Sequence, residues 1–314
     1  MSERTATWIF RGIGALMLLL GSVALVIAPL EMICFTWFSE GGRFGYEGFG
    51  FGSFLFGTLA MQIVGYYVIA LLAIPIGAYH WMLRRSIRPV MLALLRIWWI
   101  LGIPLLLVFL FILLASKTLT PGEALLVLVL ALLSYTVLPV VLGRFYRSGS
   151  VGHVLERNHP GPTRTDALGV PVLTVAGLAV FWLLGLHVLL FFSGLFPMLT
   201  GWATGVQGLA LIDGAVLTLL FLLWGITRHR RWAYWGALVY FGGMAVLWVG
   251  TALHTSWLEL LAVLAFPSTE VSILDGIPLQ GWHLAILVGL PLAGTIAAIV
   301  KVLASHEADI AIQR

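Results

Sequence analysis

Residues 124–143 read ALLVLVLALLSYTVLPVVLG and contain no Asp, Glu, Lys or Arg, whereas Glu123 precedes them and Arg144 follows them. A helix needs about 20 predominantly apolar residues to cross the hydrocarbon core of a bilayer. The backbone of such a segment must be helical, because the hydrocarbon holds no water to satisfy its N–H and C=O groups. The stretch therefore predicts a membrane-spanning helix over residues 123–143.

Further apolar runs of similar length are separated by charged residues or by clusters of Gly and Pro. With the first run, they fall at residues 9–30, 54–80, 95–115, 123–143, 170–193, 207–227, 233–254 and 282–304. The pattern predicts an all-α integral membrane protein, a bundle of about eight transmembrane helices. Trp257–Phe266 is apolar but too short for a span, so we expect an interfacial or re-entrant segment there.

The composition agrees with this class of protein. Of the 314 residues, 61% are hydrophobic and 10% are charged, whereas an average soluble domain carries roughly 25% charged residues. The mean hydropathy is +1.06. These values exclude a water-soluble enzyme, a disordered tail and a nucleic-acid-binding protein. The single cysteine, Cys34, cannot form an intramolecular disulfide and fits no paired-cysteine metal motif.

Lysine and arginine fall almost entirely on one side of the predicted bundle. Of the 17 Lys and Arg residues, only Arg43 and Lys117 lie on the other side. Because cytoplasmic loops are enriched in Lys and Arg, this pattern predicts a cell-membrane protein, of the prokaryotic inner-membrane kind, with both termini cytoplasmic. Removing residues 9–30 as a signal peptide would spoil the pattern, so we expect that span to be retained.

The arginines on the predicted cytoplasmic side are expected to contact anionic lipid headgroups, which accounts for them without an acidic protein partner. They are Arg84, Arg85, Arg88, Arg144, Arg147, Arg228, Arg230 and Arg231. No loop is long enough to hold a soluble domain. Membrane lipids and other membrane subunits are therefore the expected partners, and nucleic acid is not.

The longest predicted cytoplasmic connection, residues 144–168, divides the chain into two groups of four spans, residues 1–157 and residues 158–314. Within it, Val151–Leu155 is expected to form a short amphipathic helix at the headgroups. A Leu-Pro pair recurs in the fourth and the eighth span. Two tandem four-helix halves in parallel orientation are one interpretation of this likeness, and chance similarity between membrane segments is the other.

Polar residues at bilayer depth are costly and often mark functional sites. Asp213, His187, Gln62 and Glu31 are all predicted toward the outer side of their spans. If these helices converge, the four residues form an outward-facing substrate-binding cluster. The alternative is that they are helix-end residues that reach headgroup water or, for Asp213 and His187, groups that hydrogen-bond between helices.

The histidines His187, His254 and His283 are candidate ligands for a haem or a metal. Two axial histidines at matched depth hold a membrane haem, and His187 with His254 meet that requirement. With Asp213, the three histidines would provide four ligands for zinc. The sequence has no His-x-x-x-His pair, however, and a lone membrane histidine is more often a packing residue, so no cofactor is expected.

The first predicted outer loop, residues 36–57, alternates glycine with aromatic residues (TWFSEGGRFGYEGFGFGSFLFG). Glycine lets the backbone bend, and aromatic side chains favour the membrane interface. We expect a compact interfacial turn there. A gating or substrate-contacting loop is the alternative.

The sequence shows no signature of an intramembrane protease or an acyltransferase, such as His-Glu-x-x-His or Gly-x-Ser-x-Gly, and an enzyme is therefore not expected. Low charge, short loops and 13 Trp favour a non-catalytic subunit or scaffold of a membrane complex. The alternative is a transporter of a small molecule, an ion or a lipid that uses the outer polar cluster. A haem- or metal-binding membrane protein is the third interpretation.

Overall fold

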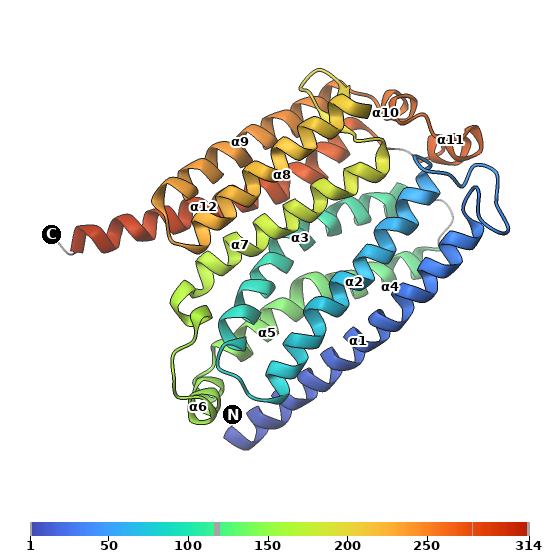
Figure 1. Cartoon of the computed structure of the whole chain (residues 1–314). Coiled ribbons are helices and arrows are strands. Elements are labelled where there is room, and N and C mark those ends of the chain that lie inside the picture. Colours follow the sequence, from blue (N-terminus) through green and yellow to red (C-terminus); the bar gives the residue numbers. More distant parts are fainter. Residues whose placement is uncertain (1, 116–119, 278, 313–314) are drawn as a thin grey trace.

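The computed structural model describes residues 2–115, 120–277 and 279–312, and Lys117 lies outside them. Within these ranges, eight helical segments are long and apolar enough to cross a bilayer, which confirms the predicted class of polytopic membrane protein. In chain order they are α1 (Glu3–Phe38), α2 (Phe54–Trp81), α3 (Ile87–Ala115), α4 (Pro121–Leu132) continued by η1 (Leu133–Val137) and α5 (Leu138–Arg147), α7 (Arg164–Val188) continued by η2 (Leu189–Phe192), α8 (Gly205–Thr227), α9 (Arg231–His254) and α12 (Gly281–Ile312) (Figure 1).

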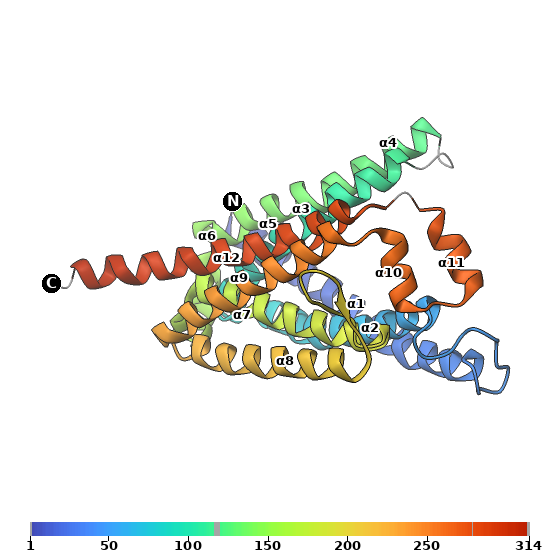
Figure 2. The same cartoon turned by 90° about the horizontal axis from the view of Figure 1, so that it is seen from above.

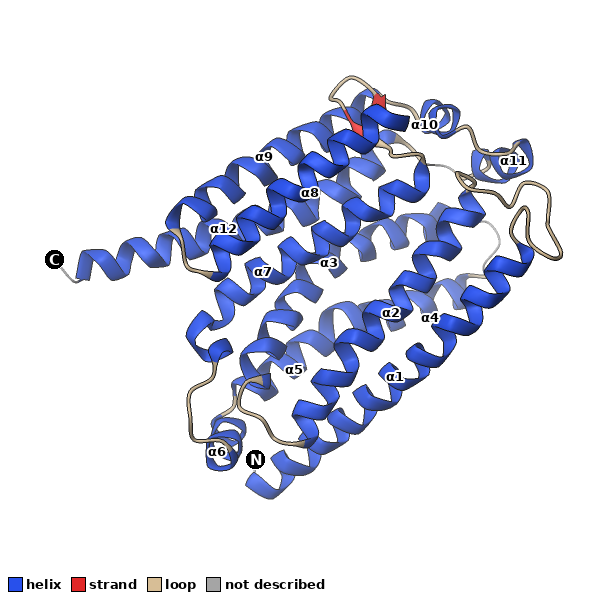
Figure 3. Ribbon diagram, viewed as in Figure 1, coloured by secondary structure: helices blue, strands red, loops and turns tan. Residues whose placement is uncertain are grey.

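The remaining elements are short and lie at the ends of the bundle. They are α6 (Gly149–Asn158), α10 (Trp257–Leu264), α11 (Ser268–Asp275) and the strands β1 (Phe196–Pro197) and β2 (Trp202–Ala203). The two strands pair in antiparallel orientation and stand out in the otherwise helical ribbon (Figure 3). Helix α10 covers most of the apolar stretch that follows α9, and its 8 residues are too few to form a span.

Helix α6 confirms the short helix expected around Val151–Leu155, but its apolar side is covered by protein. Val151 and Leu155 are buried in one cluster with Phe10 of α1 and Ile87 of α3. This helix therefore packs against the ends of α1 and α3, instead of turning its apolar side toward lipid headgroups.

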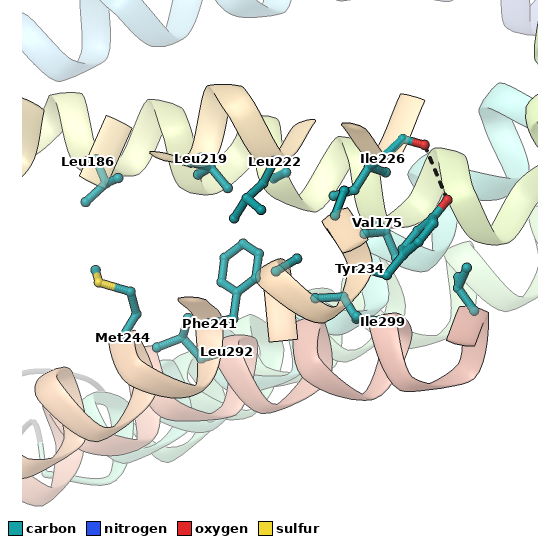
Figure 4. Packing of buried hydrophobic residues seen from close by; sticks show 14 of the residues in the cluster. Val175, Leu186, Leu219, Leu222, Ile226, Tyr234, Phe241, Met244, Leu292 and Ile299 are labelled. Carbon is teal, nitrogen blue, oxygen red and sulfur yellow. Dashed lines mark hydrogen bonds between the residues drawn. The ribbon is translucent and has the colours of Figure 1, made fainter. Parts of the chain in front are cut away.

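Helices α7, α8, α9 and α12 form a four-helix bundle whose core is built from large side chains (Figure 4). Phe241 and Tyr234 of α9 are buried there, and the Tyr234 hydroxyl donates to the carbonyl oxygen of Ile226 at 3.3 Å. Helix α3 packs against α7 and α12 and so joins this bundle to the first part of the chain.

Helices α1 and α2 form an antiparallel hairpin whose seam consists of small residues. A Cβ atom added at Gly77 would lie 2.8 Å from the carbonyl oxygen of Gly14, and one added at Gly21 would lie 3.2 Å from the Cβ of Ala73. The two backbones are thus in direct contact, as in other membrane helix pairs with small residues at the interface. Away from this seam, the hairpin contacts the rest of the chain mainly at α6, η2 and the start of α3.

The fourth span contains a π-helical turn, η1, after which the N–H of Leu138 donates to the carbonyl of Leu133. Pro139 is the second residue after this turn. A proline has no N–H, and in an α-helix its ring clashes with the carbonyl four residues earlier. The wider turn relieves that clash and keeps the span continuous.

The two ends of the bundle differ in charge. The arginine-rich end carries Arg84, Arg144 and Arg228, and the arginine-poor end carries α10, α11 and the β1–β2 hairpin. Seen from above, α8 lies at one edge of the molecule and α4 at the opposite edge (Figure 2). The tandem duplication, the division into two halves and the orientation in the membrane stay predictions.

Candidate functional site

Two of the four residues in the predicted outer cluster are in contact. Gln62 Nε2 donates to Glu31 Oε1 at 3.1 Å and lies 3.0 Å from the hydroxyl oxygen of Tyr66. The second carboxylate oxygen of Glu31 is buried and has no hydrogen-bond partner among the described residues. This pair links α1 to α2 toward the arginine-poor end of the hairpin.

Asp213 and His187 are not hydrogen-bonded to that pair. Asp213 is exposed on α8, and none of the hydrogen bonds or ion pairs within the described ranges involves its carboxylate. His187 is exposed on α7, and its Nδ1 donates to the Leu183 carbonyl of the preceding turn at 2.7 Å. The predicted cluster thus consists of one hydrogen-bonded pair and two residues that do not bond to it within the described ranges.

The candidate metal ligands are not brought together. His254 is exposed and donates from Nδ1 to the Gly250 carbonyl at 2.7 Å, whereas His283 is buried and accepts the backbone N–H of Gln280 at 2.9 Å. In the part of the chain that the structure describes, no group of three or more His, Cys, Asp or Glu is placed to hold a metal ion.

The first outer loop is compact. Phe38 stacks on Phe44 and Tyr46, with ring centroids 5.3 and 5.7 Å apart, and the Glu40 N–H donates to the Phe49 carbonyl at 2.8 Å. Aromatic contacts and backbone hydrogen bonds therefore close this loop on itself. The contacts agree with the compact turn expected from the sequence.

The arginine-rich end contains a buried polar contact that the sequence did not indicate. His80 Nε2 and the Tyr146 hydroxyl are 2.6 Å apart, and both residues are fully buried. His80 Nδ1 donates to the Ile76 carbonyl at 2.7 Å, so Nε2 is the acceptor of the Tyr146 proton. The Phe10 ring packs against both rings. This contact joins α2 to α5, with α1 beside it.

Arg88 strengthens the same junction. Its Nε donates to the Tyr146 carbonyl at 2.9 Å, and its terminal nitrogen donates to the Arg147 carbonyl at 3.4 Å. The last carbonyls of a helix have no partner within that helix. Arg88 of α3 therefore caps α5 and fixes the two helices against each other.

Three more arginines, Arg96 of α3 with Arg144 and Arg147 of α5, line a groove of about 330 Å³ that we call the arginine groove. The other lining residues are Leu92, Leu95, Trp99, Pro139, Val140 and Gly143. Within the described ranges, no carboxylate lies within 4.0 Å of these three guanidiniums. The groove therefore combines three unpaired positive charges with an apolar lining.

The other arginines assigned to lipid headgroups have different surroundings. Arg85 pairs with Asp166 at 3.3 Å, and the Arg228 guanidinium lies 4.6 Å from the ring centroid of Trp224. Arg84, Arg230 and Arg231 are exposed. These residues are spread over the arginine-rich end, whereas those of the arginine groove converge.

An apolar cavity of about 170 Å³ lies between α7, α9 and α12. Aromatic side chains such as Trp182, Tyr240 and Trp248 line it. The Trp182 indole donates to the Thr295 hydroxyl oxygen at 3.0 Å, and the Tyr240 hydroxyl donates to the Ala215 carbonyl at 3.3 Å. Both polar groups are thus already hydrogen-bonded within the protein.

The fold defines a class, an α-helical polytopic membrane protein with short connections. No family model, no curated protein and no solved structure matches this chain. The arrangement of its own residues is therefore the basis for a functional assignment.

Proposed function

We propose that this protein is a non-catalytic subunit or scaffold of a membrane complex and that it binds a transmembrane helix of a partner along the exposed face of α8. The position of Asp213 carries this proposal. Asp213 lies eight residues after Gly205, where α8 begins, and is therefore about 12 Å along the helix axis. Ionisable residues at such depth almost always face protein or water, whereas this carboxylate is exposed on the outer surface of the bundle.

Small residues beside Asp213 make room for a helix. Ala210, Gly214 and Thr218 follow one another at a spacing of four residues, and all three are exposed. A Cβ atom added at Gly214 would meet nothing within 4 Å. The Thr218 hydroxyl is already bonded to the Gly214 carbonyl at 2.8 Å. Such a spacing of small residues lets a second helix approach closely.

The chemistry of this face specifies the partner. A transmembrane helix with Lys, Arg or another hydrogen-bond donor at the level of Asp213 would satisfy the carboxylate where water is scarce. Leu217 and Phe221, which are 67% and 59% exposed, would pack against the apolar side chains of that helix. With the arginine-rich end toward the cytoplasm, as the distribution of arginine supports, the contact lies in the outer half of the membrane.

The test is gentle extraction of the tagged protein from its own membrane, followed by native mass spectrometry and an absorbance spectrum. We expect a co-purified membrane subunit with the wild type. The amount of this subunit should fall at least about tenfold in Asp213→Leu, which removes the charged contact, and in Gly214→Leu, which prevents close packing of the partner helix. Gly243→Leu is the matched control, because Gly243 is an exposed glycine of α9 with equally open surroundings.

Three outcomes would contradict the proposal. A partner retained equally by Asp213→Leu and the wild type would show that α8 is not the contact. A protein that purifies alone, with a flux or a bound small molecule that is lost in Glu31→Gln, would support the transporter instead. A haem absorbance band would support the third interpretation.

A further inference from the structure

We propose that the arginine groove binds the phosphate group of an anionic phospholipid, with an acyl chain of that lipid lying along Trp99 and Val140. This inference does not depend on the proposed function, because the groove is formed by α3 and α5 and the proposed helix contact by α8. It names one place and one ligand chemistry among the arginines at this end of the molecule.

The charges of the groove call for an anion. Arg96 and Arg147 come from different helices and repel each other electrostatically. Arg96 lies eight residues after Arg88, and Arg88 bonds the end of α5. Arg96 is therefore about 12 Å further into the bundle and is half-buried. A guanidinium at that depth is costly unless an opposite charge accompanies it.

Phosphate suits this set of donors. A guanidinium presents several N–H groups in a plane and binds phosphate oxygens through paired hydrogen bonds. Basic pockets between transmembrane helices at the cytoplasmic side are a recurrent form of anionic-lipid recognition. Arg144 and Arg147 on one wall and Arg96 on the other can contact one phosphate group from two sides.

The groove has the polarity of a lipid. On the α5 wall the lining runs from Arg147 and Arg144 near the arginine-rich end to Val140 and Pro139 further into the bundle, and on the α3 wall Trp99 lies about one turn beyond Arg96. Arg144 and Arg147 thus lie where a headgroup would be, Arg96 would reach the phosphate from deeper in the bundle, and Trp99 lies beyond Arg96, where an acyl chain would begin. Trp99 is 47% exposed, and exposed tryptophans are common near the headgroup level of membranes. A free phosphate ion would make no use of this apolar part.

The walls of the groove are fixed before any lipid binds. Arg88 holds the end of α5 against α3, and the His80–Tyr146 hydrogen bond holds α5 against α2. Binding therefore orders few protein groups, which favours affinity. Arg85, by contrast, is already paired with Asp166, so it offers a lipid less than the three unpaired arginines do.

The test is native mass spectrometry of the full chain in detergent, titrated with phosphatidylglycerol or with phosphatidylcholine. We expect the wild type to prefer phosphatidylglycerol and Arg96→Gln to weaken its binding about fivefold, the effect of one arginine near an anionic headgroup. Arg164→Gln is the control, since Arg164 is an exposed arginine at the same end of the bundle, lies outside the groove and is not one of the arginines assigned to lipid headgroups. Equal binding by the wild type and Arg96→Gln would overturn the proposal.

A second variant, Gly143→Leu, fills the groove and leaves every arginine in place. A Cβ atom at Gly143 meets nothing within 4 Å, and the side chain that extends from it would enter the groove that Gly143 lines. We expect Gly143→Leu to lose phosphatidylglycerol while its melting temperature in phosphatidylcholine stays that of the wild type. Unchanged binding would mean that diffuse surface charge attracts the lipid and would overturn the proposal.

Inorganic phosphate distinguishes the two sources of the same chemical group. We expect millimolar phosphate to compete weakly with phosphatidylglycerol, because it cannot contact Trp99 and Val140. If inorganic phosphate alone stabilises the protein as much as phosphatidylglycerol does, the groove is a site for the free anion and the lipid assignment is wrong.

Discussion

The α1–α2 hairpin and the bundle of α7, α8, α9 and α12 solve the same packing problem in opposite ways. In the hairpin, Gly14 and Gly77 bring two backbones into direct contact. In the bundle, side chains as large as Phe241 and Tyr234 fill the space between helices. The first arrangement leaves no room for a side chain at Gly14 or Gly77, whereas the second depends on large side chains.

This difference follows from the solvent around the helices. Lipid tails are as apolar as leucine, so burying a leucine between membrane helices gains little from the hydrophobic effect. What remains is close packing, together with polar contacts that have no water to compete with them. The hairpin achieves close packing through backbone contacts, and the bundle achieves it through interlocking side chains.

The largest expected effect is a break of the hairpin by Gly77→Leu. The new side chain would meet the Gly14 carbonyl oxygen and the Leu18 backbone N at about 2.8 Å, and backbone atoms can yield only if the helices separate. We expect a loss of about 3 kcal/mol in the free energy of unfolding, measured by detergent titration in mixed micelles. Gly65→Leu, an open position on the same helix, should have little effect. Equal losses for the two variants would disprove the backbone-contact seam.

Phe241→Ala tests the bundle, and a somewhat smaller effect is expected. Phe241 is 1% exposed and lines the apolar cavity between α7, α9 and α12. Truncation enlarges that cavity, and the added volume costs about 2 kcal/mol. In a water-soluble protein the same substitution would also lose the free energy of transferring the side chain from water to the apolar core. Here that contribution is absent, because the side chain exchanges only between protein and lipid. Val239→Ala, at a position that is 75% exposed on the same helix, is the control. A loss of 4 kcal/mol or more would show that the bundle core behaves like that of a water-soluble protein.

Tyr146→Phe probes the junction between these two parts of the molecule, and its effect is the smallest of the three. The change leaves His80 Nε2 buried without its 2.6 Å partner, at a cost of about 1.5 kcal/mol. Tyr240→Phe removes a hydroxyl whose hydrogen bond to the Ala215 carbonyl is 3.3 Å long, so it should cost less. Hydrogen exchange at the ends of α2 and α5 should rise in the first variant alone. If both tyrosine variants lose the same stability, His80 is not the specific partner of Tyr146.

The spans could be predicted because their signal is local. An uninterrupted apolar run such as residues 124–143 is visible without knowing any neighbour. The contact between Glu31 and Gln62 could also be predicted from local information. Both residues are polar groups within predicted spans, and these two spans are consecutive in the sequence.

The contacts at the arginine-rich end could not be predicted, because they depend on how helices are rotated about their axes. His80 and Tyr146 are 66 residues apart, and nothing in the sequence shows that they face each other. The sequence assigns Arg96 to the predicted cytoplasmic side, whereas α3 begins at Ile87 and places Arg96 well inside the helix. Asp213 was recognised as unusual, but only the structure shows that it is exposed on the surface of the bundle.

The π-helical turn in the fourth span changes which side of that helix meets α3. Leu130 and Ala131 line a groove with α3 before the turn, Ser134 and Tyr135 do so within it, and the pairs Pro139–Val140 and Gly143–Arg144 do so after it. Successive pairs are four residues apart, except that the pairs Ser134–Tyr135 and Pro139–Val140 on either side of the end of the turn are five residues apart.

An extra residue retards the helical phase by about 100°. In an uninterrupted α-helix, the apolar residues before the turn would still face α3. The arginine-bearing residues after the turn would then be rotated away from α3. The extra residue of the π-helical turn thus rotates the second part of the span about its axis. Because of this rotation, the span turns an apolar side toward α3 before the turn and a cationic side toward α3 after it.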